Sequence, residues 1–103
     1  MAEKKLILVT NDDGIQADGL RALAESIEDL GDVFTVAPEL EQSASSHSIT
    51  LDKPLRINDH GRKRYGVSGT PTDCVLLAIH RILERKPDIL ISGINHGPNM
   101  GED

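Results

Sequence analysis

Two adjacent aspartates, Asp12 and Asp13, follow the apolar run 6–9 and are flanked by Asn11 and Gly14. Two ionised carboxylates a few ångströms apart near a protein surface repel each other by about 4 kcal/mol unless a cation lies between them. A divalent ion bound through hard oxygen ligands removes that repulsion. Asn, Asp and Gly are also the commonest turn formers, so this segment alone supports a metal site and a plain turn about equally.

Two other stretches carry oxygen donors of the same hard type. Ser43 lies in a serine-rich polar stretch, and Asn95 lies in a glycine-rich one. Together with Asp12 and Asp13 they offer two carboxylates, a hydroxyl and an amide carbonyl. This set suits Mg²⁺ or Mn²⁺ and suits Zn²⁺ or Cu²⁺ poorly.

The glycine-rich stretch around Asn95 also has the features of an anion site. Gly93, Gly97 and Gly101 let the backbone approach a ligand closely and turn its N–H groups toward an anion. A metal ion beside such a loop suggests a phosphate, because the ion lowers the pKa of a bound water for attack on phosphorus and offsets charge on the phosphoryl oxygens.

Hydrophobic periodicity predicts the scaffold that these residues need. Residues 6–9 are typical of a strand buried on both faces, 33–37 of a second strand and 88–92 of a third buried strand. Apolar residues at helical spacing over 20–30 predict a helix that Gly31 ends. Strand, helix and strand in this order predict a βαβ unit with two parallel strands.

The middle of the chain predicts a β-hairpin. Apolar residues at alternate or near-alternate positions over 49–57 and the returning segment 65–68 flank a predicted turn at 58–61. The basic triplet 62–64 is interpreted as a solvated edge of this hairpin.

A second helix is predicted after the hairpin. Thr70 suits the N-cap position, Pro71 the first helical position, and Asp73 can reach back as in a capping box. The helix should run to about Arg85, and its apolar run 74–79 predicts a well buried element.

The loops that carry chemistry follow the three predicted parallel strands. Asp12 and Asp13 follow the first strand, Ser43 the second and Asn95 the third. Parallel strands deliver these loops to one edge of the sheet, where open α/β sheets bind their ligands. We therefore predict an α/β fold, Rossmann-like and three-layered (α/β/α), with a mainly parallel sheet and a β-hairpin excursion.

Composition limits the partners and the setting of the chain. Its 103 residues fit one small domain, and its net charge of −6 argues against a stable complex with nucleic acid. Cys74 is the one cysteine and, among apolar neighbours, should be a buried, inert thiol. No apolar run is long enough to cross a bilayer, so we expect a cytoplasmic protein. His47, His60 and His96 are interpreted as surface residues.

At these residues the chain resembles a known family, the SurE-type survival protein E nucleotidases. The resemblance covers the whole chain in order and rests on four segments: Thr10-Asn11-Asp12-Asp13-Gly14-Ile15, then Ala37-Pro38 followed by Ser43, then Ser68-Gly69-Thr70-Pro71-Thr72-Asp73-Cys74, and Ser92-Gly93-Ile94-Asn95-His96-Gly97-Pro98-Asn99. One departure is Ala44, where family members often have glycine. Family members continue well past Asp103, so the resemblance implies that residues 1–103 are the N-terminal part of a longer domain.

The resemblance implies a metal-dependent phosphomonoesterase that hydrolyses nucleoside 5′- and 3′-monophosphates without a phospho-enzyme, and that forms a homo-oligomer, a dimer or a tetramer. One divalent ion would be held by Asp12, Asp13, Ser43 and Asn95. The residues at the reaction would be Asp12, Asp13 and Asn95, and those at the phosphate would be Gly93, Asn95, Gly97 and Asn99.

Other readings stay open from the residues themselves. A receiver-like Mg²⁺-binding signalling module also has an acidic pair after its first strand, but it needs an aspartate at the end of its third strand, whereas Asp88 opens that strand. A haloacid-dehalogenase-like phosphatase needs Asp-x-Asp spacing, which Asp12-Asp13 lacks. An inactive, metal-binding fragment is the remaining alternative.

Overall fold

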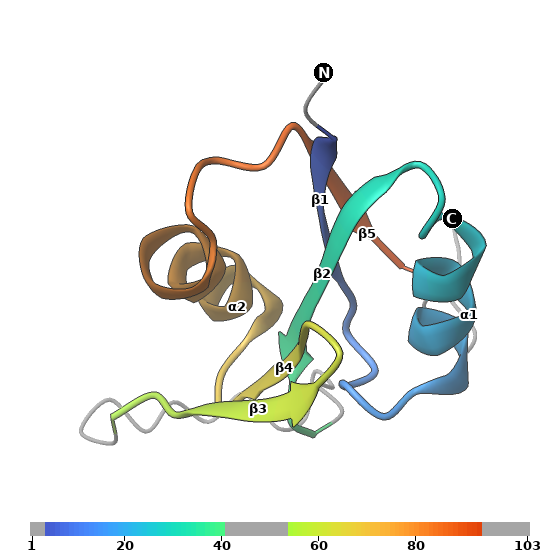
Figure 1. The fold of residues 1–103 in the computed structure, drawn as a ribbon. Helices are drawn as coiled ribbons and strands as arrows, with labels where there is room; N and C mark the ends of the chain where they lie inside the picture. Colours follow the sequence, from blue (N-terminus) through green and yellow to red (C-terminus); the bar gives the residue numbers. More distant parts are fainter. Residues whose placement is uncertain (1–3, 41–53, 94–103) are drawn as a thin grey trace, which may run out of the picture.

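The computed structural model describes residues 4–40 and 54–93. Its elements are β1 (Lys5–Thr10), α1 (Asp18–Ser26), β2 (Gly31–Pro38), β3 (Ile57–Gly61), β4 (Arg64–Val67), α2 (Pro71–Leu77), a π-helical turn directly after it (Ala78–Ile82), and β5 (Ile89–Ser92). Figure 1 shows α1 and α2 on opposite sides of the strands, which is the predicted three-layer arrangement. No helix in this part of the chain is long and apolar enough to span a membrane.

The five strands form one sheet in the order β3-β4-β2-β1-β5. β1 pairs in parallel with β2 on one side and with β5 on the other, and β4 pairs in parallel with β2. Among the described strands β3 alone is antiparallel, and it forms a hairpin with β4. The α/β class, the mainly parallel sheet and the hairpin are confirmed. The hairpin widens the sheet and does not leave it.

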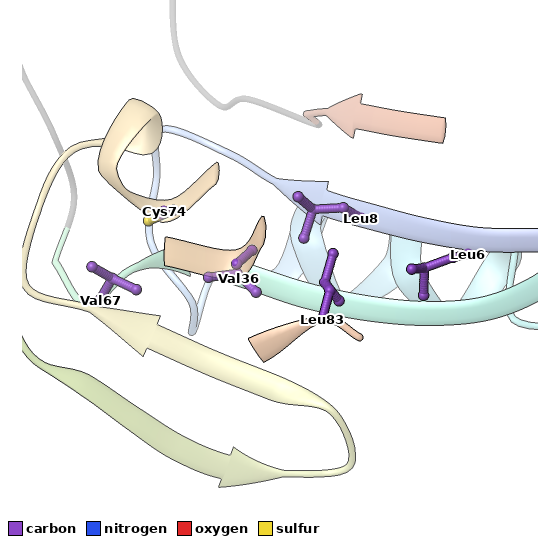
Figure 2. Packing of buried hydrophobic residues seen from close by; sticks show 7 residues of the cluster. Leu6, Leu8, Val36, Val67, Cys74 and Leu83 are labelled. Carbon is purple, nitrogen blue, oxygen red and sulfur yellow. The ribbon is translucent and has the colours of Figure 1, made fainter. Parts of the chain in front are cut away.

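The side chains of β1 alternate between two hydrophobic layers, because successive residues of a strand point to opposite faces. Leu6 and Leu8 belong to the layer under α2, and Ile7 and Val9 belong to the layer under α1. Figure 2 shows the first of these layers, with Leu6, Leu8, Val36, Val67, Cys74 and Leu83 labelled. β1 is therefore buried on both faces, as its sequence predicts.

β5 is not the buried strand that its apolar run predicts. Ile89 is 44% exposed and Leu90 is 50% exposed. β5 pairs with β1 on one side and has no described strand on the other. The apolar side chains of β5 are typical of a strand that is covered by other parts of a protein. Among the described residues, none covers Ile89 and Leu90 fully.

The first helix ends earlier than its periodicity predicts. α1 stops at Ser26, and a turn closed by the hydrogen bond from Leu30 N to Ile27 O (2.8 Å) leads into β2. Gly31 does not end the helix but opens β2, where a Cβ would collide with the carbonyl oxygen of Lys5 on β1. The glycine is thus explained by the close approach of two strands.

The hairpin turn lies further along the chain than predicted. Residues 58–61 belong to β3, with an irregular register between Asp59 and Gly61, and the reversal falls at Arg62 and Lys63, whose φ angles are 58° and 60°. Left-handed φ at both central residues matches the twist of a two-residue hairpin turn.

The basic triplet 62–64 is only partly the solvated edge that we predicted. Arg62 and Lys63 are exposed, and Lys63 forms an ion pair with Asp32. Arg64 is half-buried, and its Nη2 donates to the carbonyl oxygen of Ile15 at 3.0 Å. The third residue therefore ties the hairpin to the loop after β1.

The second helix starts as predicted and ends early. Thr70 Oγ1 accepts from Asp73 N at 3.2 Å, and Asp73 Oδ2 accepts from Thr70 N at 2.9 Å, which completes the capping box. The last turn is π-helical, and Leu83 is already extended, so the helix stops short of Arg85. It is buried along one stripe only, since Leu76 on another face is 50% exposed.

We expect Thr70→Ala to lower the free energy of unfolding by about 1 kcal/mol, because the amide of Asp73 loses its acceptor. Chemical denaturation measures this change. Thr72→Ala is the matched control, since Thr72 is exposed in the same turn and is not the cap. Equal losses in the two variants would contradict the role of the cap.

Candidate active site

The described ends of β1, β2 and β5 lie at one edge of the sheet. Thr10 is in register with Ser92, and the amide of Gly93 donates to the carbonyl oxygen of Thr10 at 2.9 Å. The amide of Ile15 donates to the carbonyl oxygen of Pro38 at 2.7 Å. The ends of these three strands therefore lie side by side, which confirms that the parallel strands end at one edge of the sheet.

A buried side chain, Asn11, shapes the loop after β1. Its Nδ2 donates to Gly14 O at 3.1 Å, and its Oδ1 accepts from Gly14 N at the same distance. Asn11 is fully buried, whereas Asp12 is exposed and Asp13 is half-buried. The segment is a tight turn, and this turn presents the two carboxylates outside the core, so the turn and the site are compatible.

The two carboxylates suit a hard divalent cation, because adjacent carboxylate oxygens are a favourable part of such a coordination sphere. In residues 4–40 and 54–93 there is no group of three or more His, Cys, Asp or Glu side chains that could hold a metal ion. Of the four predicted metal ligands, Asp12 and Asp13 belong to these described residues. Its other members, Ser43 and Asn95, lie outside the described residues.

The residues predicted at the phosphate are only partly described. Gly97 and Asn99, like Asn95, lie outside the described residues. Gly93 is buried at the end of β5, and its amide already donates a hydrogen bond to the carbonyl oxygen of Thr10. Any phosphate contact at Gly93 therefore depends on close approach of its backbone and not on a hydrogen bond from its amide.

The thiol of Cys74 lies beneath this edge and is fully buried. Burial, together with the neighbouring Asp73 carboxylate, raises the pKa of the Cys74 thiol to about 12. The thiol stays protonated at neutral pH, in agreement with the predicted inert cysteine. Its polar neighbour is the buried hydroxyl of Thr10, which makes no hydrogen bond of ordinary geometry within the described residues.

Sequence reasoning missed a polar cluster at the end of β2. Glu39 Oε2 accepts from Asn58 Nδ2 at 2.8 Å and lies 2.9 Å from His60 Nε2. Partial burial alone would raise the pKa of Glu39, but the hydrogen bonds from His60 and Asn58 outweigh it and lower the pKa below its ordinary value. His60, interpreted as a surface residue, is 23% exposed and paired. His47 and His96 lie outside the described residues.

A groove of about 840 Å³ lies elsewhere, between α1 and the hairpin turn. Its lining includes Arg21, Lys63 and Arg64, and also Glu25 and Glu28, so it has no single charge sign. Neither aspartate of the loop after β1 lines it. The groove is therefore not the site predicted at the carboxyl edge of the sheet.

Comparisons with known proteins agree with this arrangement. The family model described as Survival protein SurE matches residues 7–103. The chain is 58% identical to a 5′-nucleotidase SurE of Geotalea daltonii over 94% of its length, and 59% identical to that of Gemmatimonas aurantiaca over the same share. It covers 39% and 38% of these two relatives.

A solved structure has the same fold. The crystal structure of the SurE protein from Aquifex aeolicus superimposes with a TM-score of 0.82 at 46% identity. The match covers 94% of this chain and 40% of that protein. The chain thus spans about two fifths of the length of the relatives that it matches.

Proposed function

This chain belongs to the survival protein SurE family, and from that premise we propose that the protein carrying it is a metal-dependent phosphomonoesterase of nucleoside 5′- and 3′-monophosphates. The observation that carries the proposal is the pair Asp12 and Asp13, presented by a turn that the buried Asn11 holds, at the edge where three parallel strands end. Relatives at 58% and 59% identity are named 5′-nucleotidases, which supports the substrate class.

In this proposal Asp12 and Asp13, with Ser43 and Asn95, hold one divalent ion, Mg²⁺ or Mn²⁺. When bound, such an ion supplies an activated water and offsets charge on the phosphoryl oxygens. Asp12, Asp13 and Asn95 act at the reacting group.

The remaining contacts concern the phosphate and the shape of the site. The loop residues proposed to hold the phosphate are Gly93, Asn95, Gly97 and Asn99. Asn11 keeps the two carboxylates in place through its hydrogen bonds to Gly14. As the family resemblance implies, hydrolysis is proposed to proceed without a phospho-enzyme.

The position of Asp88 argues against the receiver-like alternative. Asp88 Oδ2 accepts from Leu6 N at 2.7 Å and from Arg85 Nη1 at 3.0 Å, at the end of the sheet where β1 begins. A phospho-accepting aspartate would have to lie at the other end, beside Asp12. The backbone hydrogen bond from Leu6, with the Arg85 contact, lowers the pKa of Asp88, which fits a structural role.

Phosphate release from a panel of nucleoside monophosphates tests the proposal. The complete protein that carries this chain and the 103-residue chain alone are each assayed with Mn²⁺, with Mg²⁺ and with EDTA. We expect release by the complete protein with either metal and none with EDTA, because the carboxylate pair cannot supply the charge compensation by itself. Release that is unchanged by EDTA would refute metal dependence.

The isolated chain distinguishes the last alternative. If it binds Mn²⁺ but releases no phosphate, the remaining part of the protein completes the site, and residues 1–103 are the inactive metal-binding fragment. Homo-oligomerisation, a cytoplasmic location, the absence of a nucleic-acid complex and the assignment of residues 1–103 to the N-terminal part of a longer domain remain expectations from the sequence.

A further inference from the structure

The chain leaves β2 at a point that is tied to the hairpin by one residue, Glu39. Its amide donates to the carbonyl oxygen of Val67 at 2.8 Å, and its carboxylate oxygen Oε2 receives hydrogen bonds from Asn58 and His60 of β3. We propose that Glu39 is a positioning residue of the active site. Its hydrogen bonds to Val67, Asn58 and His60, here called the Glu39 clamp, fix the point at which the chain leaves β2, and thereby the start of the segment that carries Ser43. The inference rests on the proposed function, because Ser43 is a proposed metal ligand.

The geometry of the clamp is built into the hairpin. Asn58 and His60 of β3 lie on either side of Asp59, and both side chains reach Glu39 Oε2, so they share one face of the hairpin. Gly66 of β4 lies opposite Asn58 and beside Ala37 of β2. A Cβ at Gly66 would collide with the Glu39 carboxylate and would lie 3.0 Å from His60 Nε2. The carboxylate and the imidazole therefore occupy the space that the missing side chain leaves.

The other flank of segment 41–53 is tied to the same place. Ser68, directly after β4, accepts at its Oγ from Arg56 N at 2.8 Å, and the Ser68 amide donates to Arg56 O at 3.0 Å. Glu39, before the segment, and Arg56, after it, are thus both hydrogen-bonded to the chain at the end of β4. Of the two ties, only the one at Glu39 depends on a charged side chain that lies close in sequence to Ser43.

The hydrogen-bond partners of the Glu39 carboxylate are side chains of the hairpin, as expected for a residue that positions the backbone and does not itself react. Among the described residues, the hydrogen bonds to the carboxylate come from Asn58 and His60 of β3, and Oε2 accepts both of them. Arg64 lies on the same face, two residues before Gly66, but its guanidinium donates a hydrogen bond to the carbonyl oxygen of Ile15 and not to Glu39. Glu39 would therefore act on the metal through the backbone that follows it.

The test is the dissociation constant of Mn²⁺ for the complete protein that carries this chain, measured by titration alongside kcat and the thermal midpoint. We expect Glu39→Ala to weaken Mn²⁺ binding about tenfold, the lower end of the range for residues that orient metal ligands. Glu39→Gln should stay within about twofold of wild type, since one amide oxygen can accept both hydrogen bonds. Rescue by glutamine separates positioning from a direct effect of negative charge on the cation.

Two further variants keep the test decisive if Glu39→Ala does not fold. Asn58→Ala removes one donor of the clamp and should weaken Mn²⁺ binding to a smaller extent. Gly66→Ala places a methyl group where the carboxylate lies and should weaken it as Glu39→Ala does. Ile57→Ala is the matched control, because this 37% exposed side chain lies on the opposite face of β3 and its loss loosens the hairpin alone.

Wild-type Mn²⁺ affinity in Glu39→Ala or Gly66→Ala would overturn the inference, even if the thermal midpoint falls. Equal weakening in Glu39→Gln and Glu39→Ala would also overturn it, because charge and not position would then be responsible. The proposed function fails separately: a wild-type protein that binds Mn²⁺ but releases no phosphate refutes the nucleotidase, while the Mn²⁺ series still decides the role of Glu39. A wild-type protein that binds no Mn²⁺ refutes both.

Discussion

Asp13→Asn should abolish metal-dependent phosphate release by the complete protein that carries this chain. We expect a loss of more than about a hundredfold, the upper end of the effect of a residue that only orients a ligand. The substitution keeps the shape of the side chain but removes one of two adjacent negative charges at the mouth of the site. Asp12→Asn should act in the same way, because both carboxylates belong to one turn held by Asn11.

The measurement is the initial rate of phosphate release at saturating Mn²⁺, with the dissociation constant of Mn²⁺ determined in parallel. Asp18→Asn is the control, since Asp18 opens α1 just beyond the same loop and is exposed. It removes an equal charge without touching the turn. Wild-type rates in Asp12→Asn or Asp13→Asn would refute the proposed ligands, and an equal loss in Asp18→Asn would indicate a general effect of charge.

Features that depend on neighbours in the sequence were predictable. The strand β1 was found because a short run of branched apolar residues has to be buried on both faces. The capping box at Thr70 was found because its two hydrogen bonds join residues three positions apart. The common edge at which Thr10 and Ser92 lie in register is predictable because parallel strands run in the same direction and end at the same edge of the sheet.

Features set by distant contacts were not predictable. Gly31 has the composition of a helix stop, but its place is explained by the carbonyl of Lys5 on a neighbouring strand. The contact between Glu39 and His60 joins residues 21 positions apart, and no spacing rule connects them. The exposure of Leu90 depends on which residues pack against β5, at the edge of the described sheet. A short apolar run carries no information about such distant neighbours.

Asn11→Ala should cost about 2 to 6 kcal/mol of unfolding free energy. The buried amide and carbonyl of Gly14 would both lose their partner, and each unpaired buried group costs about 1 to 3 kcal/mol. Chemical denaturation of the complete protein measures the loss. Gln16→Ala is the control, because Gln16 is an exposed polar residue of the same loop. A loss in Asn11→Ala no larger than that in Gln16→Ala would contradict the role of the buried side chain.

Asn11→Asp separates the two hydrogen bonds, because it keeps an acceptor for the Gly14 amide but sets a second oxygen against the Gly14 carbonyl. Burial beside a carbonyl oxygen raises the pKa of the introduced carboxyl above its unfolded-state value. The proton is then bound more tightly in the folded state, so the penalty is largest above the folded-state pKa and shrinks as the pH falls through it. Stability relative to wild type should therefore improve toward acidic pH, whereas the deficit of Asn11→Ala should stay constant. No deficit in Asn11→Asp at any pH would mean that the donor to Gly14 O is dispensable, and that the acceptor for its amide alone shapes the turn that presents Asp12 and Asp13.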